Sequence, residues 1–501
     1  MKNAQEQRFS SRWTLLLSVL GIAVGTGNIW RFPLIAAQNG GDDGAGAFLF
    51  AWLVFLLVWS IPLIIAEYAL GQRGRMGVVG TFAKLAGERF AWMGAFVGFV
   101  ATAIMFYYAV VAGWCFFYTT ESLFAGLPLT TESAMATWDS FQAGGWPLIF
   151  HALAMLLGAL ACWQGVRSIE KANQILVPTL LVIVVIAVLR AVTLPGAGAG
   201  LAYLFTPDWS QLAEPRIWLE ALTQNAWDTG AGWGLILTYA AYMKKEHGVV
   251  RNAVLTGVGN NTVSLLAATM IFGTVFAGLG AELGRGEILD VMRSSGPAST
   301  GLTFIWMPQL FAQMAFGKVL AVLFFLALSF AALSSLISMI ELASRALVDF
   351  GLPRHRAVAT VAGVGFVLGV PSALNLDFFA NQDFVWGVAL MLSGAFVAFA
   401  VGRYGVQRLR EELATPEDWG IPSAWGTVIR VLVPLQAVVL LVWWLGLAAT
   451  VYAPETWYNP FDPFSPMTCL VQWAIVLGLF VALNRWMVRR LHADQPAAVE
   501  R

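Results

Sequence analysis

Long apolar stretches recur along the whole 501-residue chain, and they limit its possible folds more than any other feature. Each stretch is about 20 residues long, which is enough for a helix to cross a bilayer core of roughly 30 Å. Hydrophobic residues make up 58% of the sequence and charged residues only 12%, too few to cover a soluble protein of this length. The sequence therefore predicts an all-α membrane protein.

Twelve membrane-spanning helices are expected. The predicted spans are 13–37, 45–71, 91–124, 147–163, 174–193, 215–243, 250–279, 317–350, 357–372, 378–402, 427–452 and 465–488. An even number of spans places both ends of the chain on one side of the membrane. With these spans, the basic loops around Arg73, Arg167 and Arg403 lie on that same side. By the positive-inside rule that side is the cytoplasm. We therefore expect a multi-pass protein of the cell (inner) membrane with both termini cytoplasmic.

The spans divide into two sets of five, with two further helices after them. The expected parts are an N-terminal tail (1–12), a first five-helix repeat (13–193), a second repeat (215–402), helices 11 and 12 (427–488) and a C-terminal tail (489–501). Because five is odd, the second repeat enters the membrane from the opposite face. Such inverted repeats are a common transporter architecture.

Glycine clusters lie near the middle of the first helix of each set. They are Gly21, Gly25 and Gly27 in the first set and Gly230, Gly232 and Gly234 in the second. Glycine-interrupted segments at matching positions indicate two broken helices around a binding site at the bilayer midplane. A single cluster would favour close packing of intact helices instead. Two clusters beside polar residues favour the broken helices.

Polar side chains accompany these glycines inside apolar spans, where each needs a partner or a function. The set comprises Asn28, Arg31, Gln224, Asn225, Asp228, Asn260, Asn261, Ser264, Ser334, Ser335, Ser338, Glu341 and Asp383. Side-chain oxygens together with the carbonyls of a broken helix suit a hard monovalent cation such as sodium. The free N–H groups at the start of a half-helix suit a carboxylate.

At this point the sequence resembles the neurotransmitter:sodium symporters, the amino-acid and amine transporter family with the LeuT-type fold, in its prokaryotic form. The resemblance is strongest in the first span, which reads Gly21-Ile-Ala-Val-Gly-Thr-Gly-Asn28-Ile-Trp-Arg31-Phe-Pro33. It continues at Gln224…Gly232-Trp-Gly234, Tyr107-Tyr108 and Ser334-Ser335. The resemblance implies a sodium-coupled secondary symporter that works by alternating access. Its cargo would be a small amine-bearing solute, foremost a neutral or apolar amino acid.

The resemblance also implies two bound sodium ions. Sodium site A would consist of the Ala23 carbonyl, the side-chain oxygens of Asn28 and Asn260, and Asp228. Sodium site B would consist of the carbonyls of Gly21, Val24 and Ala331 and the hydroxyls of Ser334 and Ser335.

By the same resemblance, the solute would lie between the broken helices. Its carboxylate would meet the amides of Thr26 and Gly27 and the Tyr108 hydroxyl, and its amine would meet carbonyls of the two breaks. The complete expected set is Ala23, Gly25, Thr26, Gly27, Ile104, Tyr108, Trp227, Asp228, Gly230, Trp233, Ser335 and Met339. The gate residues would be Arg31 and Asp383 outside, and Arg8 with Asp349 near Tyr242 inside, although the family's inner arginine aligns with Glu6.

Asp228 departs from the family, which usually has serine or threonine at this position. Chloride-independent relatives carry a carboxylate at the position of Ser264, and Trp52 stands where a chloride-coordinating tyrosine is expected. A carboxylate within about 4 Å of sodium in a partly dry site can replace a mobile anion. We therefore expect Asp228 to be a fixed counter-charge that makes chloride unnecessary. Two alternatives stay open: Asp228 stands in for the carboxylate of a substrate that lacks one, or it merely pairs with a neighbour.

Other functions also stay open. A proton-coupled carrier would use Glu67, Asp228 or Glu341 as the titrating group, a channel would carry repeated polar stripes, and a receptor would bind without transporting. The sequence contains no nucleophile–base pair, metal cluster or phosphate loop, so an enzyme is not expected. A balance of 29 basic and 29 acidic residues gives no reason to expect nucleic acid as a partner. Segment 281–316 is expected to form an extracellular lid.

Overall fold

The computed structural model describes residues 8–294, 300–416 and 418–493, and the regular structure in these ranges is helical apart from one bridge between Ala45 and Pro207. In the same ranges, nine helices are long and apolar enough to cross a bilayer, and the bent pair of α8 and α9 makes a tenth if it counts as one span. The predicted spans 13–37 and 215–243 fall outside this count because each is divided into shorter helices.

The first half of the chain contains α1 (Arg12–Ala23), α2 (Thr26–Ile29), α3 (Arg31–Gln38), α4 (Gly46–Phe55), the π-helical turn η1 (Leu56–Ser60), α5 (Ile61–Gly74), α6 (Val78–Leu85), η2 (Glu88–Phe90), α7 (Ala91–Phe124), α8 (Thr131–Ala143), α9 (Trp146–Cys162), α10 (Val166–Val192), α11 (Ala197–Phe205) and η3 (Trp209–Ala213). The second half contains α12 (Pro215–Asp228), α13 (Leu235–Ala240), α14 (Val249–Leu279), α15 (Arg285–Arg293), η5 (Leu302–Trp306), α16 (Met307–Ala312), α17 (Gly317–Asp349), α18 (Arg354–Leu374), α19 (Leu376–Tyr404), α20 (Val406–Glu412), α21 (Trp425–Thr427), η6 (Val428–Leu432), α22 (Val433–Leu447), η7 (Ala448–Tyr452) and α23 (Pro466–Ala493).

Polar caps set where several helices begin. Ser11 accepts a hydrogen bond from the Thr14 amide at 3.2 Å, and Thr14 bonds back to the Ser11 amide, which closes a capping box at the start of α1. Asn375 ends α18 and caps α19 through the Phe378 amide at 2.8 Å. These local signals explain why the chain turns between helices at these points.

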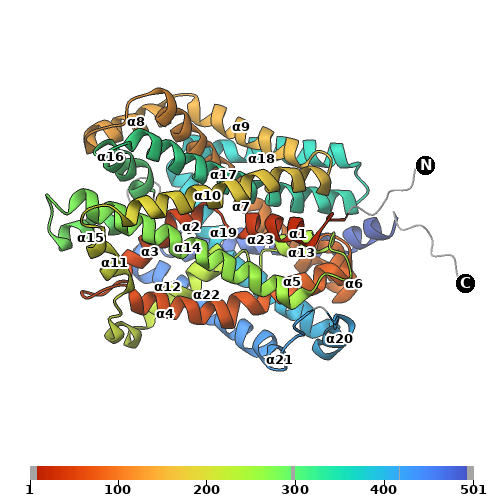
Figure 1. Ribbon diagram of the computed structural model, residues 1–501. Coiled ribbons are helices and arrows are strands. Elements are labelled where there is room, and N and C mark those ends of the chain that lie inside the picture. The colour runs from red at the N-terminus through yellow and green to blue at the C-terminus, as the bar shows by residue number, and fades with distance from the viewer. Residues whose placement is uncertain (1–7, 295–299, 417, 494–501) are drawn as a thin grey trace, which may run out of the picture.

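The long helices α7 and α17 form the centre of the bundle and make its most extensive helix–helix contact. Figure 1 shows them running through the middle, with α10 and α14 on one side and α9 and α18 on another. Elements α6 and α20 lie at one end of the bundle, and α11 and α15 lie at the other (Figure 1). The short helices α1, α2 and α13, which surround the candidate site, pack inside this frame.

The part of segment 281–316 that the structure describes forms α15, η5 and α16, and residues 295–299 lie outside the described ranges. Arg293 in α15 donates to the carbonyls of Ala37 at 2.9 Å and Gly40 at 3.1 Å, and Arg285 bonds to the Asp42 and Asp43 carbonyls. The segment therefore covers the end of α3, as a lid at that end of the bundle would.

Candidate functional site

The first predicted span is broken between Ala23, where α1 ends, and Thr26, where α2 begins. The Gly25 amide bonds to the Asn28 side-chain oxygen at 2.8 Å, and the Thr26 amide bonds to the Tyr108 hydroxyl at 3.3 Å. A Cβ on Gly25 would lie 3.1 Å from the Ser335 hydroxyl and 3.2 Å from that of Tyr108. Gly25 is thus needed because α7 and α17 approach the break closely.

The second predicted span is broken between Asp228, where α12 ends, and Leu235, where α13 begins. Gly230, Gly232 and Gly234 have φ angles of 66°, 87° and 79°, a left-handed conformation that only glycine adopts easily. The breaks therefore lie where the glycine clusters predict them.

Glu67 of α5 satisfies the backbone of this second break. Its carboxylate accepts hydrogen bonds from the amides of Gly232 at 2.6 Å, Gly234 at 3.2 Å and Leu237 at 2.9 Å. Glu67 is completely buried, so these amides would otherwise be unpaired in an apolar surrounding. From the sequence, Glu67 is expected only as a titrating group of a proton-coupled carrier, and nothing local in the sequence indicates this capping role.

The four residues expected at sodium site A, namely Ala23, Asn28, Asp228 and Asn260, meet beside the first break. The Asn28 amide nitrogen lies 2.8 Å from the Asn260 side-chain oxygen and 2.7 Å from the Ser264 hydroxyl. The same Asn260 atom lies 2.9 Å from the carbonyl oxygen of Ala23 and 3.1 Å from that of Asp228. If this atom is the amide nitrogen, it donates to both carbonyls. If it is the oxygen, three oxygens converge on one point, an arrangement that a cation stabilises.

The Asp228 side chain adds a negative charge next to this group. One carboxylate oxygen accepts from the Ser264 hydroxyl at 3.4 Å, and the other has no hydrogen-bond partner although it is buried. That second oxygen lies 3.2 Å from where a Cβ on Gly27 would be. Asp228 therefore presents an unpaired carboxylate oxygen to the start of α2, where the half-helix has free amides.

Sodium site B is built from the end of α1 and the middle of α17. The Ser335 hydroxyl lies 3.3 Å from the carbonyl oxygens of both Gly21 and Ile22, and the Ser334 hydroxyl bonds to the Ala331 carbonyl at 3.0 Å. The expected carbonyl of Val24 has no polar contact with either serine in the described structure, while that of Ile22 does. Four of the five expected residues are thus brought together.

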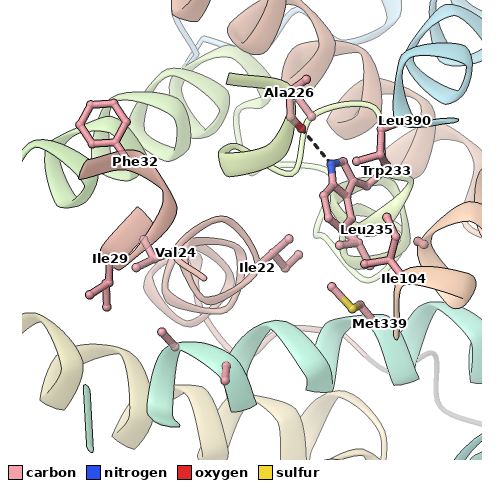
Figure 2. Close-up of a cluster of buried hydrophobic side chains, with 14 of the residues drawn as sticks. Ile22, Val24, Ile29, Phe32, Ile104, Ala226, Trp233, Leu235, Met339 and Leu390 are labelled. Atoms are coloured by element: carbon pink, nitrogen blue, oxygen red, sulfur yellow. Dashed lines mark hydrogen bonds between the residues drawn. The ribbon is translucent and has the colours of Figure 1, made fainter. Parts of the chain in front are cut away.

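A cavity of about 510 Å³ opens between the two breaks. Eleven of the twelve residues expected to contact the solute line it, namely Ala23, Gly25, Thr26, Gly27, Tyr108, Trp227, Asp228, Gly230, Trp233, Ser335 and Met339. The twelfth, Ile104, is fully buried and is not among the lining residues, and Figure 2 draws it in the same buried cluster as Trp233 and Met339. Leu235 and Ile22 also line the cavity, so its inner part is largely apolar.

Toward the end of the bundle that carries α15, the cavity continues past Arg31 and Asp383. The Arg31 guanidinium lies over the Trp227 ring, 4.8 Å from its centre, and no ion pair joins Arg31 to Asp383 in the described structure. Both expected outer gate residues therefore line this part of the cavity.

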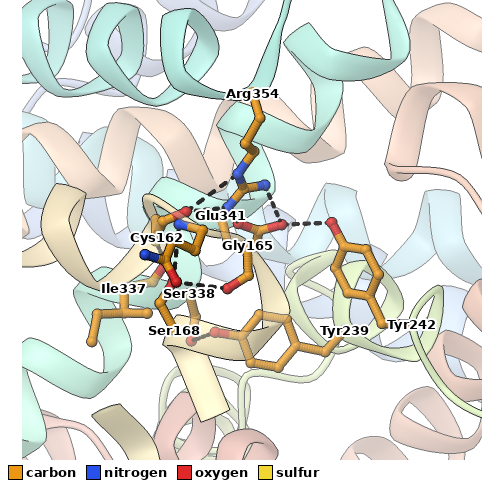
Figure 3. A network of polar contacts seen from close by, with 10 residues as sticks. Cys162, Gly165, Ser168, Tyr239, Tyr242, Ile337, Ser338, Glu341 and Arg354 are labelled. Atoms are coloured by element: carbon orange, nitrogen blue, oxygen red, sulfur yellow. Dashed lines mark hydrogen bonds and ion pairs between the residues drawn. The ribbon is translucent and has the colours of Figure 1, made fainter. Parts of the chain in front are cut away.

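A polar network surrounds Tyr242, one of the expected inner gate residues (Figure 3). The Tyr242 hydroxyl donates to Glu341 at 2.6 Å, and Arg354 forms an ion pair with the same carboxylate. Arg354 also donates to the Cys162 carbonyl at 2.7 Å, and the Phe9 amide donates to the Tyr242 carbonyl at 3.2 Å. This network ties α9, α17, α18 and the turn after α13 together.

The expected inner gate pair of Arg8 and Asp349 stays a prediction, and the structure shows which other groups hold Asp349. Asp349 is paired with Arg345, one turn before it on α17, at 3.0 Å, and it accepts from the Gly77 amide at 2.6 Å. Arg345 and Asp349 are four residues apart on one helix, a spacing at which opposite charges pair readily. Glu6, the position with which the family's inner arginine aligns, lies outside the described residues.

Comparisons with known proteins agree with this geometry. The sequence model described as "Sodium:neurotransmitter symporter family" matches residues 6–142 and 139–493. An uncharacterized sodium-dependent transporter of Methanocaldococcus jannaschii is 31% identical and covers 88% of this chain and 91% of its own. The sodium-dependent serotonin transporter of Drosophila melanogaster is 30% identical, and the match covers 79% of this chain and 70% of that transporter.

Among solved structures, the crystal structure of MhsT in complex with L-phenylalanine is similar, with a TM-score of 0.75 at 29% identity, covering 87% of this chain and 99% of that chain. The relatives are sodium-dependent carriers, which agrees with the expectation that this chain is not an enzyme. The structure has two broken helices around a cavity, and the matches span nearly the whole sequence. The chain is a multi-pass membrane protein of the sodium:neurotransmitter symporter family, with a LeuT-type fold and sodium-coupled transport.

Proposed function

We propose that this protein is a symporter that imports a neutral or apolar amino acid together with sodium, by alternating access. The observation that supports this most is the cavity between the two helix breaks, which combines free backbone groups with apolar walls. The N–H groups at the start of α2 and the Tyr108 hydroxyl suit the solute carboxylate. The carbonyls of Ala23, Trp227 and Asp228 suit its amine, and the walls with Trp233 and Met339 suit an apolar side chain.

Two sodium ions are proposed to accompany the solute. Site A would use Ala23, Asn28, Asn260 and Asp228, and the converging oxygens around Asn260 support it. Site B would use Gly21, Ala331, Ser334 and Ser335, with Ile22 as a candidate carbonyl in addition to Val24. Oxygen donors of this kind suit hard cations.

The expected division into two inverted five-helix repeats and two extra helices belongs to the same proposal, as does a cell-membrane location with cytoplasmic termini. Support for the orientation comes from one end of the bundle, where the basic residues Arg73, Lys84, Arg403 and Arg408 gather. The Lys244 ammonium lies 3.4 Å from the Ser10 carbonyl, which brings the N-terminal segment to the same region as another basic loop.

A second candidate cargo is an amine without a carboxylate. It is favoured by the unpaired Asp228 oxygen beside Gly27, because this oxygen lies near the place where the carboxylate of an amino acid would bind. A thermal-shift screen of amino acids and amines separates the two. If the cargo is an amino acid, amino acids should stabilise the purified protein, and only when sodium is present. If amines stabilise the protein and amino acids do not, the cargo is an amine without a carboxylate.

Transport itself is tested in proteoliposomes with a sodium gradient imposed at constant pH. Uptake of the solute found in the screen should follow the sodium gradient. Uptake that follows an imposed proton gradient without sodium would contradict the proposal and favour a proton-coupled carrier. Binding without counterflow of labelled solute would indicate a receptor.

Chloride replacement tests the proposed role of Asp228 in the wild-type protein. With gluconate in place of chloride on both sides of the membrane, sodium-driven uptake should keep its full rate, because a fixed carboxylate supplies the negative charge. The measurement is the initial rate at saturating sodium in the two media, with potassium gluconate and potassium chloride as the inner solutions. Loss of uptake in gluconate would contradict a fixed counter-charge.

A further inference from the structure

A second cavity, of about 410 Å³, lies where α5, α6, α19 and α20 meet, away from the solute cavity. Its lining consists of Arg73, Lys84, Leu85, Arg403, Tyr404 and Arg408. Four of these six residues are cations and none is an acid. We refer to this cavity as the basic pocket, and α6 and α20 mark its end of the bundle in Figure 1.

The positive charge of the basic pocket is only partly balanced. Glu412 at its edge is paired with Arg73 at 2.8 Å and with Arg408 at 2.9 Å, so two cations share one carboxylate. The Lys84 ammonium donates to the Gly74 carbonyl at 3.1 Å, and Arg403 lies over the Phe90 ring at 5.6 Å. Neither of these two cations has an ion pair in the described structure. Four cations therefore face one acid.

The neighbouring positive charges affect the protonation of Lys84. Partial burial lowers the pKa of Lys84, and the neighbouring guanidinium groups of Arg73 and Arg75 lower it further. The charged form of Lys84 is thus disfavoured by its surroundings, and an anion among these side chains would favour it.

The depth of the pocket is set by the two long helices that border it. The candidate spans Gly46–Gly74 and Leu376–Tyr404 both end at the pocket, since Arg73 precedes the last residue of the first and Tyr404 is the last residue of the second. Membrane helices end where the lipid headgroups begin. The pocket therefore lies at headgroup level, on the side with most basic residues.

From these observations we infer that the basic pocket binds a phosphate-bearing anion. Arginine forks match phosphate oxygens in pairs of hydrogen bonds, and lysine adds a point charge. The same chemistry is offered by the headgroup of an anionic lipid and by free phosphate. Basic pockets between membrane helices at this level are suited to lipid headgroups.

The test uses the full-length protein and two sources of phosphate. Retention of phosphatidylglycerol is measured by native mass spectrometry after extraction from phosphatidylcholine vesicles with and without that lipid. Free phosphate is measured by thermal shift in a zwitterionic detergent at constant ionic strength. Binding of the lipid alone identifies the headgroup as the source, and a response to both shows that phosphate itself is sufficient.

Variants locate the binding. The Lys84→Gln, Arg403→Gln double variant should bind roughly 30-fold more weakly, since each base near a membrane surface contributes about fivefold. Glu412→Gln should bind more tightly, because it removes the one acid at the pocket edge. The matched control is Arg167→Gln, Lys171→Gln, which removes two exposed bases outside the pocket. Equal loss in the control and the pocket variant, or no binding by wild type, would overturn the inference.

Discussion

Asp228→Asn is expected to lower the apparent sodium affinity of transport about 30-fold. Asparagine keeps the size of the side chain and the backbone carbonyl but removes the negative charge. Coulomb's law gives about 4 kcal/mol for unit charges 4 Å apart at an effective dielectric constant of 20. We take half of this, about 2 kcal/mol, which corresponds to roughly 30-fold in affinity. The only other acid among the residues that line the cavity is Asp383, one of the expected outer gate residues.

The measurement is the sodium concentration that gives half-maximal uptake in proteoliposomes. The control is Asp377→Asn, the same substitution at an exposed position in the first turn of α19. If Asp228 replaces a mobile anion, chloride should partly restore the sodium affinity of the Asn variant and leave the wild type unchanged. An unchanged sodium dependence in Asp228→Asn would remove this residue from sodium site A.

Glu67→Gln is expected to destabilise the protein by about 3 kcal/mol and to abolish transport. The carboxylate of Glu67 accepts three backbone hydrogen bonds at the second break. A glutamine amide would present an N–H group to at least one of these N–H donors, which leaves a buried donor unpaired. Hydrogen bonds to a charged acceptor contribute about 1.5–3 kcal/mol each, and a buried unpaired group costs about 1–3 kcal/mol.

Thermal unfolding in detergent, followed by sodium-driven uptake, measures both effects. The exposed Glu282→Gln variant controls for loss of a carboxylate, because Glu282 lies in the short turn after α14. A Glu67→Gln protein that keeps wild-type stability but loses sensitivity to pH would instead support proton coupling through this residue. Full stability together with full uptake would rule out both roles.

The positions of the helix breaks could be predicted because their signals are local in sequence. The glycines at 25 and at 230, 232 and 234 lie within a few residues of the points where α1 and α12 end. Apolar length predicted the long spans for the same reason. The sodium and solute residues came from the family resemblance, and the structure brings most of them to one cavity.

Contacts between distant residues were not predictable in this way. Glu67 caps a segment 165 residues later in the chain, and Glu341 meets Tyr242 across 99 residues. Nothing near either glutamate indicates its partner, since each depends on how whole helices pack. Arg345 was missed for a different reason. The resemblance implied only an N-terminal arginine as the partner of Asp349, whereas Arg345 lies one turn away on α17.

The three left-handed glycines of the second break have a consequence for how new specificities arise. A side chain at 232 or 234 would be strained by its φ angle and would collide with backbone or packed side chains nearby. The backbone path of the second break is therefore fixed, and new specificities have to come from side chains that line the cavity, such as Trp233 beside this break, Val111 of α7 and Met339 of α17. Directed evolution toward bulkier or smaller cargo should concentrate its libraries there.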